Sequence, residues 1–131
     1  LTPLFLLYLL EKGEKTMQLT INDKTYNVKF GVKFVRALDK AYPIEQQGLK
    51  FGMALSAKIP ELYAKNIASL ADIIYYGTVT ESPRPSLTDV ETYVEECKDL
   101  EQLFDDVLQE LSESNAGKSL LQEMNQGLKK K

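Results

Sequence analysis

Residues 17–38 read MQLTINDKTYNVKFGVKFVRAL, and the spacing of their apolar side chains changes near Gly31. Before Gly31, apolar and polar residues alternate on both sides of Asn22-Asp23-Lys24, a sequence typical of a tight turn. After Gly31, apolar residues recur every three or four positions until Tyr42-Pro43. The stretch therefore predicts a β-hairpin that is followed directly by an amphipathic helix.

The rest of the chain is predicted to form helices separated by polar connectors. Apolar residues at helical spacing follow candidate N-caps at Asn66, Ser86 and Asp99. Gly77 is a predicted stop for the helix that Asn66 begins, and Pro60 is predicted to open a helical turn after a short apolar segment. We therefore predict a mainly α (α+β) fold, in which an N-terminal β-hairpin precedes a compact bundle of four to six helices.

The predicted core combines the exit of the hairpin with three helices. The helix after Asn66 is the expected central one, because residues 73–76 are apolar on nearly every side. The helix after Asp99 has the strongest amphipathic face, and its opposite face is acidic. The predicted core residues are Phe30, Phe34, Val35, Leu38, Leu70, Ile74, Leu103, Phe104 and Val107.

The composition indicates one small domain that lacks the usual catalytic side chains. Its 131 residues suffice for a single core, and 44% apolar with 27% charged residues is typical of globular proteins. The chain has no histidine, which removes the commonest general base near neutral pH and the commonest zinc ligand. The single cysteine, Cys97, excludes an internal disulfide and is interpreted as a small core residue. Catalytic, cofactor and metal sites are therefore not expected.

Charge is distributed unevenly along the chain. Residues 17–65 contain eight Lys or Arg against four Asp or Glu, whereas residues 81–115 contain eleven Asp or Glu against two Lys or Arg. This asymmetry is compatible with head-to-tail self-association or with an acidic-to-basic contact with a partner. It is equally compatible with two solvated faces of one domain.

Three patterns suggest ligand sites but fit structural roles better. Residues 112–119 (SESNAGKS) end like a phosphate-binding loop, but they lack its first glycine and follow an acidic helix instead of a strand. The carboxylates within residues 95–110 lack the loop order of a calcium site and favour a solvated helix face. Basic residues near Phe30, Phe34 and Phe51 suggest a nucleic-acid patch, but these rings lie in apolar periodic stripes and are better explained as core.

The two ends of the chain differ from its central part. Residues 1–16 contain an apolar run that is too short to span a bilayer, and they are interpreted as a translated leader that precedes Met17. The alternative is a native N-terminal helix that packs its leucines on a neighbour. Residues 116–131 are predicted to form a weakly ordered C-terminal helix or tail. Its apolar stripe is the candidate partner-binding site and comprises Leu120, Leu121, Met124 and Leu128.

Seven segments, taken in order, resemble the tail assembly chaperones of long-tailed (siphovirus-like) phages and prophages of Gram-positive bacteria. The segments are MQLTINDK (17–24), GVKFVRALD (31–39), GLKFGM (48–53), IPELY (59–63), LADIIY (70–75), PRPS (83–86) and DLEQLFDDV (99–107). The resemblance covers residues 17–115 and implies that they form a single chaperone domain.

The resemblance implies a non-enzymatic protein that uses no cofactor. Such chaperones bind the tape-measure protein and help tail-tube subunits to polymerise around it in the cytoplasm of the host bacterium, and they are absent from the mature virion. The implied partners are the tape-measure protein, the tail-tube protein and further copies of the chain, with no nucleic acid and no membrane. The alternative is a small regulatory or nucleic-acid-associated phage protein, for which salt-dependent DNA binding is expected.

Overall fold

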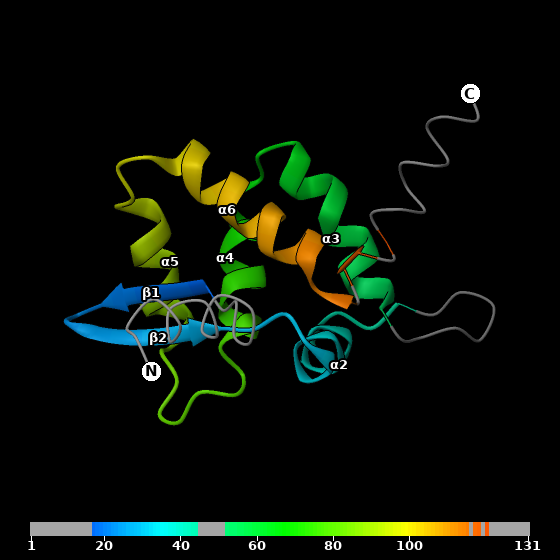
Figure 1. The fold of residues 1–131 in the computed structure, drawn as a ribbon, viewed down its shortest axis with the longest axis horizontal. Helices are drawn as coiled ribbons and strands as arrows, with labels where there is room; N and C mark the ends of the chain where they lie inside the picture. The colour runs from blue at the N-terminus through cyan, green and yellow to red at the C-terminus, as the bar shows by residue number, and fades with distance from the viewer. Residues whose placement is uncertain (1–16, 45–51, 116, 119, 121–131) are drawn as a thin grey trace, which may run out of the picture.

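The computed structural model describes residues 17–44, 52–115, 117–118 and 120 (Figure 1). It opens with a two-stranded antiparallel hairpin, β1 (Met17–Ile21) and β2 (Lys24–Val28). The helices in the described residues are α2 (Val32–Ala41), α3 (Met53–Tyr63), α4 (Ile67–Gly77), α5 (Leu87–Glu95) and α6 (Leu100–Glu113). The predicted mainly α fold, a hairpin followed by four to six helices, is confirmed. Residues 1–16, interpreted above as leader, lie outside the described residues.

The hairpin closes through a tight turn, as predicted, but Lys24 already belongs to β2, so the turn has two residues. Ile21 pairs with Lys24, and Asn22 and Asp23 between them have φ angles of 52° and 65°. Positive φ at both positions matches the twist of the strands, and Asn and Asp tolerate it better than most residues. The buried face of the hairpin, which α4 and α5 contact, comprises Leu19, Ile21 and Val28.

α4 is the central helix, as predicted, and it contacts α2, α3, α5, α6 and β2 (Figure 1). Asn66 caps its first turn, since the side-chain oxygen accepts a hydrogen bond from the backbone N–H of Ser69 at 3.1 Å. Leu70, Ile73 and Ile74 are fully buried, so this helix carries much of the core.

α4 ends at Gly77, as predicted, but the reason is not a left-handed glycine. Gly77 is the last helical residue, and a Cβ atom there would lie 2.5 Å from Cγ1 of Val28 and 2.9 Å from Cε1 of Phe30. The missing side chain lets the end of α4 approach the hairpin closely. The backbone N–H of Lys29 then donates to the carbonyl oxygen of Gly77 at 2.8 Å.

The predicted role of Pro60 is wrong. Pro60 lies inside α3, which runs without interruption from Met53 to Tyr63, and opens no new turn. Proline cannot donate a backbone hydrogen bond, so the helix lacks one bond at this point. The buried side chains on both sides of Pro60 keep the helix continuous, because packing outweighs local propensity. These side chains are Ala54, Leu55, Ile59 and Leu62.

The N-terminus of α3 is capped from another helix. Gly52 precedes α3 with a φ of 82° and has no side chain to cap it. The carboxylate of Asp39 on α2 accepts hydrogen bonds from the N–H groups of Gly52 at 2.7 Å and Ala54 at 3.1 Å. An acidic group at a helix N-terminus also interacts favourably with the helix dipole. Asp39 therefore joins α2 to α3.

The predicted caps of the last two helices are confirmed. Ser86 and Asp89 form a complete capping box at the start of α5. Asp99 caps α6 by accepting a hydrogen bond from the backbone N–H of Gln102 at 3.1 Å. The side chain of Gln102 donates to Asp106 at 2.8 Å instead of returning to the cap.

The single core lies between the hairpin and the helices. The rings of Phe30 and Phe34 meet edge to face with centroids 4.9 Å apart, which joins the exit of the hairpin to α2. Every predicted core residue is buried, so this prediction is confirmed. These residues are Phe30, Phe34, Val35, Leu38, Leu70, Ile74, Leu103, Phe104 and Val107.

Candidate partner-binding surface

Three tyrosines and two cations form one row on the surface where α2, α3 and α4 meet, and we call it the tyrosine ledge. Its members, all half-buried, are Tyr42, Lys58, Tyr75, Tyr76 and Arg84. The centroid of the Tyr76 ring lies 6.2 Å from that of Tyr42 and 5.0 Å from that of Tyr75. Nζ of Lys58 lies 4.2 Å from the centroid of Tyr42, and the guanidinium carbon of Arg84 lies 4.1 Å from that of Tyr75. A cation therefore covers each end of the aromatic row.

Ends of elements position these side chains. Tyr42 is the C-cap of α2, where Pro43 follows and stops the helix. Tyr75 and Tyr76 lie in the last turn of α4, and Arg84 lies in the connector to α5. The connector is held to the hairpin because the carboxylate of Glu81 accepts a hydrogen bond from the backbone N–H of Asn27 at 2.7 Å.

The hydroxyl of Tyr42 is held in its protonated form. Burial, a hydrogen bond with the carboxylate of Asp72 and the negative charge of that carboxylate together raise its pKa to about 12. Burial also raises the pKa of Tyr76. Both hydroxyl groups therefore stay neutral at physiological pH and can act as hydrogen-bond donors.

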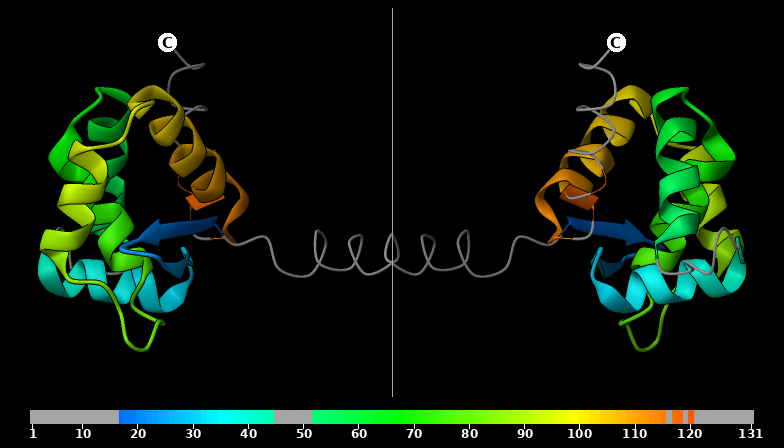
Figure 2. Two further views of the ribbon diagram at one scale, coloured as in Figure 1. Left: turned by 90° about the vertical axis from the view of Figure 1, so that its left-hand side faces the viewer. Right: turned by 90° about the vertical axis from the view of Figure 1, so that its right-hand side faces the viewer.

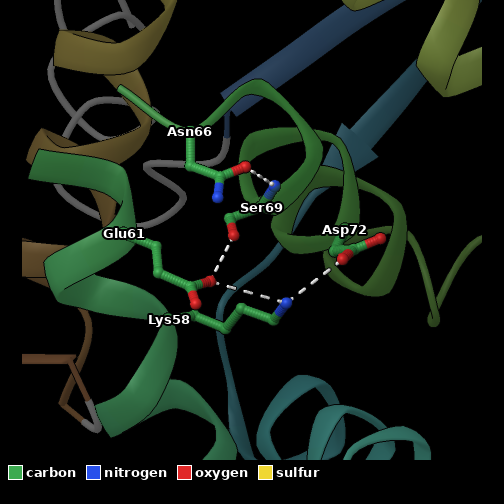
Figure 3. A network of polar contacts seen from close by, with 5 residues as sticks. All are labelled: Lys58, Glu61, Asn66, Ser69 and Asp72. Carbon is green, nitrogen blue, oxygen red and sulfur yellow. Dashed lines mark hydrogen bonds and ion pairs between the residues drawn. The ribbon is translucent and has the colours of Figure 1, made fainter. Parts of the chain in front are cut away.

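A network of polar side chains supports the ledge from α3 and α4 (Figure 3). Nζ of Lys58 lies 3.2 Å from Oδ2 of Asp72 and 3.7 Å from Oε1 of Glu61. Glu61 also accepts a hydrogen bond from the hydroxyl of Ser69, and the backbone N–H of Ser69 donates to the side chain of Asn66. The side chains of Lys58 and Asp72 are only 15% and 17% exposed, so this pair is screened less than a surface ion pair. The network holds the ammonium group of Lys58 against the ring of Tyr42.

Arg84 is oriented by the backbone and not by a carboxylate. Its Nη2 donates to the carbonyl oxygen of Tyr75 at 3.1 Å, and the hydroxyl of Thr78 donates to the same oxygen at 2.6 Å. Nε of Arg84 is buried and has no hydrogen-bond partner in the described residues. Within the residues that the structure describes, no ion pair joins Arg84 to a carboxylate. Among the described residues, the guanidinium group is thus held by a backbone carbonyl and by the ring of Tyr75, without a carboxylate partner.

Exposed apolar side chains lie outside the ledge. Among the large apolar residues that the structure describes, the most exposed are Val32 at 58%, Tyr63 at 57% and Ile67 at 47%. Val32 borders a shallow groove that residues 30–32 of the hairpin exit form with residues 113–115 at the end of α6. Tyr63 and Ile67 flank the turn between α3 and α4.

Only one member of the predicted partner-binding stripe falls in the described part of the chain. Leu120 is half-buried and packs against the core. Leu121, Met124 and Leu128 lie outside the described residues, so the stripe stays a prediction.

The sequence reasoning missed the tyrosine ledge, because it counted residues 73–76 as uniformly apolar. The sequence did contain one indication of the ledge, because the hydroxyl group of a half-buried tyrosine needs a polar partner.

The other patterns singled out in the sequence have ordinary structural positions. Ser112 and Glu113 belong to α6, so a helix and not a strand precedes the loop-like sequence around Gly117. Helix α6 itself ends before Gly117, with Ser114 as its C-cap. Cys97 is half-buried in the turn after α5 and packs against the core.

The remaining patterns concern metal and nucleic-acid binding. Within the described ranges, no group of three His, Cys, Asp or Glu side chains is placed to hold a metal ion. Phe30 and Phe34 lie in the core, as expected, whereas Phe51 is outside the described residues. None of the helices in the described part is long and apolar enough to cross a membrane.

Comparison with known proteins identifies the family. Residues 18–126 match the family model described as "Phage tail assembly chaperone protein, TAC". No curated protein matches significantly, and no solved structure does. The matched segment contains nearly all of the hairpin and all of the helices described above. The chain therefore belongs to the phage tail assembly chaperone family, whose members are non-enzymatic chaperones.

Proposed function

We propose that this chaperone binds the tape-measure protein and promotes polymerisation of tail-tube subunits around it. It acts in the cytoplasm of the host bacterium and is absent from the mature virion. The phage is long-tailed, and its host is Gram-positive. The observation that carries the proposal is the family match, which extends through the hairpin and all the described helices.

The tyrosine ledge is the contact surface that we assign to the tape-measure protein. Tyrosine and arginine are enriched among the residues that dominate binding energy at protein interfaces. The ledge offers aromatic surface in one row with the cation of Arg84, which has no carboxylate partner among the described residues. An amphipathic helix of the partner fits this chemistry when apolar side chains cover the rings and a carboxylate reaches Arg84.

A second contact surface is the predicted C-terminal stripe of Leu120, Leu121, Met124 and Leu128. Leucine and methionine at helical spacing form the kind of face that packs in a partner groove or on a partner helix. Substitutions can distinguish the two surfaces, because binding at the tyrosine ledge depends on charge and binding at the stripe depends on apolar area.

Co-expression with fragments of the tape-measure protein tests the proposal. The full chain should co-purify with at least one fragment and keep it in solution, without nucleotide. Arg84→Gln should weaken that binding at least tenfold, because it removes the cation but keeps a polar side chain. Lys24→Gln, in the hairpin at an exposed position, is the matched control and should bind as the unchanged chain does.

Two results would contradict this proposal. Normal binding by Arg84→Gln together with loss of binding by Leu121→Asp would move the contact to the C-terminal stripe. Failure to bind any tape-measure fragment, with DNA binding that weakens as salt rises, would replace the chaperone proposal by the nucleic-acid alternative.

A further inference from the structure

The outer side of β1 is an open strand edge. The two-residue turn makes Ile21 and Lys24 a hydrogen-bonded pair, so every second residue of β1 bonds to β2 and the residues between them point away from it. The backbone N–H and C=O groups of Gln18 and Thr20 therefore point outward. Within the residues that the structure describes, no other strand or backbone segment bonds to these groups.

Side-chain contacts between the two strands agree with this assignment. Nε2 of Gln18 donates to Oδ1 of Asn27 at 2.9 Å, and the hydroxyl oxygens of Thr20 and Thr25 lie 3.2 Å apart. Side chains approach each other most closely at the pairs whose backbone groups do not bond to each other. Gln18 and Thr20 are therefore the residues whose backbone is left for a further strand.

The corresponding edge of β2, by contrast, is covered. The backbone N–H of Asn27 donates to the carboxylate of Glu81 at 2.7 Å, and that of Lys29 donates to the carbonyl oxygen of Gly77 at 2.8 Å. In Figure 1 and in both views of Figure 2, the connector from α4 to α5 runs below the hairpin, on the side of β2. The sequence of β1, MQLTI, also contains no charged residue and no proline, which commonly protect a strand edge. The edge of β1 is thus suited to pairing.

A polar pocket of about 170 Å³ lies between the end of β1 and α5, and we call it the edge pocket. Its lining residues are Thr20, Ile21, Asn22, Asp89, Thr92, Tyr93 and Glu96. Two of these described residues are acidic and none is basic, while Ile21 and Tyr93 add apolar surface. A lysine or arginine side chain suits such a lining, because it joins an apolar stem to a cationic end. Small-molecule sites usually exceed about 300 Å³, so the edge pocket fits a single side chain better.

We propose that an extended segment of a partner protein pairs with β1 as a third strand and places a lysine or arginine in the edge pocket. Backbone hydrogen bonds to Gln18 and Thr20 provide affinity, and the pocket selects segments that carry a basic side chain. Residues 4–10 of this chain, LFLLYLL, offer no basic side chain to the pocket, so a partner is the better occupant. The site binds extended chain, and it does not depend on the proposed contact of a helix with the tyrosine ledge.

Amide hydrogen exchange of the full chain, followed by NMR, tests whether the edge is open. The N–H groups of Leu19 and Ile21 bond to β2, so those of Gln18 and Thr20 should exchange about tenfold faster or more. A short synthetic peptide of alternating valine and threonine with one central arginine should bind and slow the exchange at Gln18 and Thr20. Slow exchange at these two residues before the peptide is added would overturn the proposal, because the chain would then cover its own edge.

N-methylated peptides test the strand pairing without any change to the protein. Methylation of one alternate set of peptide N–H groups, those that face β1, should weaken binding about tenfold or more. Methylation of the other alternate set should leave binding nearly unchanged. Equal binding by the two methylated peptides would exclude pairing with β1.

A proline in β1 tests the edge from the side of the protein. Thr20→Pro removes an outward N–H group and leaves the hydrogen bonds between β1 and β2, as edge strands permit. It should weaken peptide binding about tenfold or more, whereas Thr25→Pro, at the paired position on β2, is the matched control and should bind normally. Circular dichroism should confirm that both variants are folded, and the methylated peptides decide the question if Thr20→Pro is not. Normal binding by a folded Thr20→Pro would refute the proposal.

The edge pocket is tested at Glu96, because Asp89 also caps α5. Glu96→Gln should weaken binding of the arginine peptide about two- to fivefold, the range typical of exposed charge pairs, and should not affect a peptide with glutamine in place of arginine. Glu95→Gln is the matched control, since Glu95 is exposed but does not line the pocket. Equal effects of the two substitutions would remove the edge pocket from the proposed site.

Discussion

Replacing Gly77 with alanine tests how closely α4 packs on the hairpin. The added Cβ atom would lie 2.5 Å from Cγ1 of Val28 and 2.9 Å from Cε1 of Phe30. Both distances are far below van der Waals contact, so either α4 or the hairpin has to move. Val28 is only 1% exposed, and a β-branched side chain has little freedom to rotate away. The shift would also strain the hydrogen bond from the N–H of Lys29 to the carbonyl oxygen of residue 77.

The expected magnitude follows from two opposing effects. Overpacking a closed core costs about 1 to 3 kcal/mol, whereas the better helix propensity of alanine returns at most about 1 kcal/mol at a helix end. We expect Gly77→Ala to lower the free energy of unfolding by about 1 to 2 kcal/mol, because the neighbouring side chains are rigid and buried.

Urea unfolding followed by circular dichroism measures this change. Gly31→Ala is the control for the added methyl group, since nothing lies within 4 Å of a Cβ atom there. Gly31 is the N-cap of α2, where alanine is less favourable than glycine, so we expect Gly31→Ala to cost no more than about 1 kcal/mol. In the double variant Gly77→Ala/Val28→Ala, the second change removes the clashing methyl group, so the two costs should sum to more than the double variant shows. Equal or higher stability of Gly77→Ala would refute the close packing of α4 on the hairpin.

Three further predictions concern the core, a cap and the tyrosine ledge. Phe104→Ala should lower the free energy of unfolding by about 3 to 5 kcal/mol in urea unfolding, because the residue is only 1% exposed. A loss below about 1 kcal/mol would contradict the place of Phe104 in the core. Asp39→Ala should cost about 0.5 to 2 kcal/mol in the same assay by uncapping α3 from the neighbouring helix, and an unchanged midpoint would argue against that contact. The pKa of Tyr42 is about 12 in the folded protein, above its ordinary value of 10.0, so the folded state holds this proton more tightly and stability should fall as pH rises from 10 to 12. Tyr42→Phe should make that decline shallower, and an unchanged pH dependence would show that Tyr42 titrates normally.

The sequence by itself determined the local elements and most of the core. Alternation around Asn22 and Asp23 predicted the hairpin, since side chains in a strand alternate between faces and the turn needs residues that tolerate positive φ. The caps at Ser86 and Asp99 were equally readable, because the capping side chain and the N–H groups it binds lie within three residues of each other. Phe104 and the rest of the predicted core followed from apolar spacing alone. Each of these features depends on neighbours that are close in the chain.

Only the tertiary structure decided the features that depend on which elements meet. Pro60 remains inside α3 because the buried side chains of that helix pack in the core. The stabilisation from this packing cannot be predicted from the residues next to Pro60 in the sequence. Asp39 accepts a hydrogen bond from the N–H of Gly52, the N-cap residue of α3, which lies thirteen residues later in the chain. The tyrosine ledge joins the ends of α2 and α4 to a side chain from α3 and another from a connector. Such contacts are set by the packing of distant segments, and a single sequence carries no periodic signal for them.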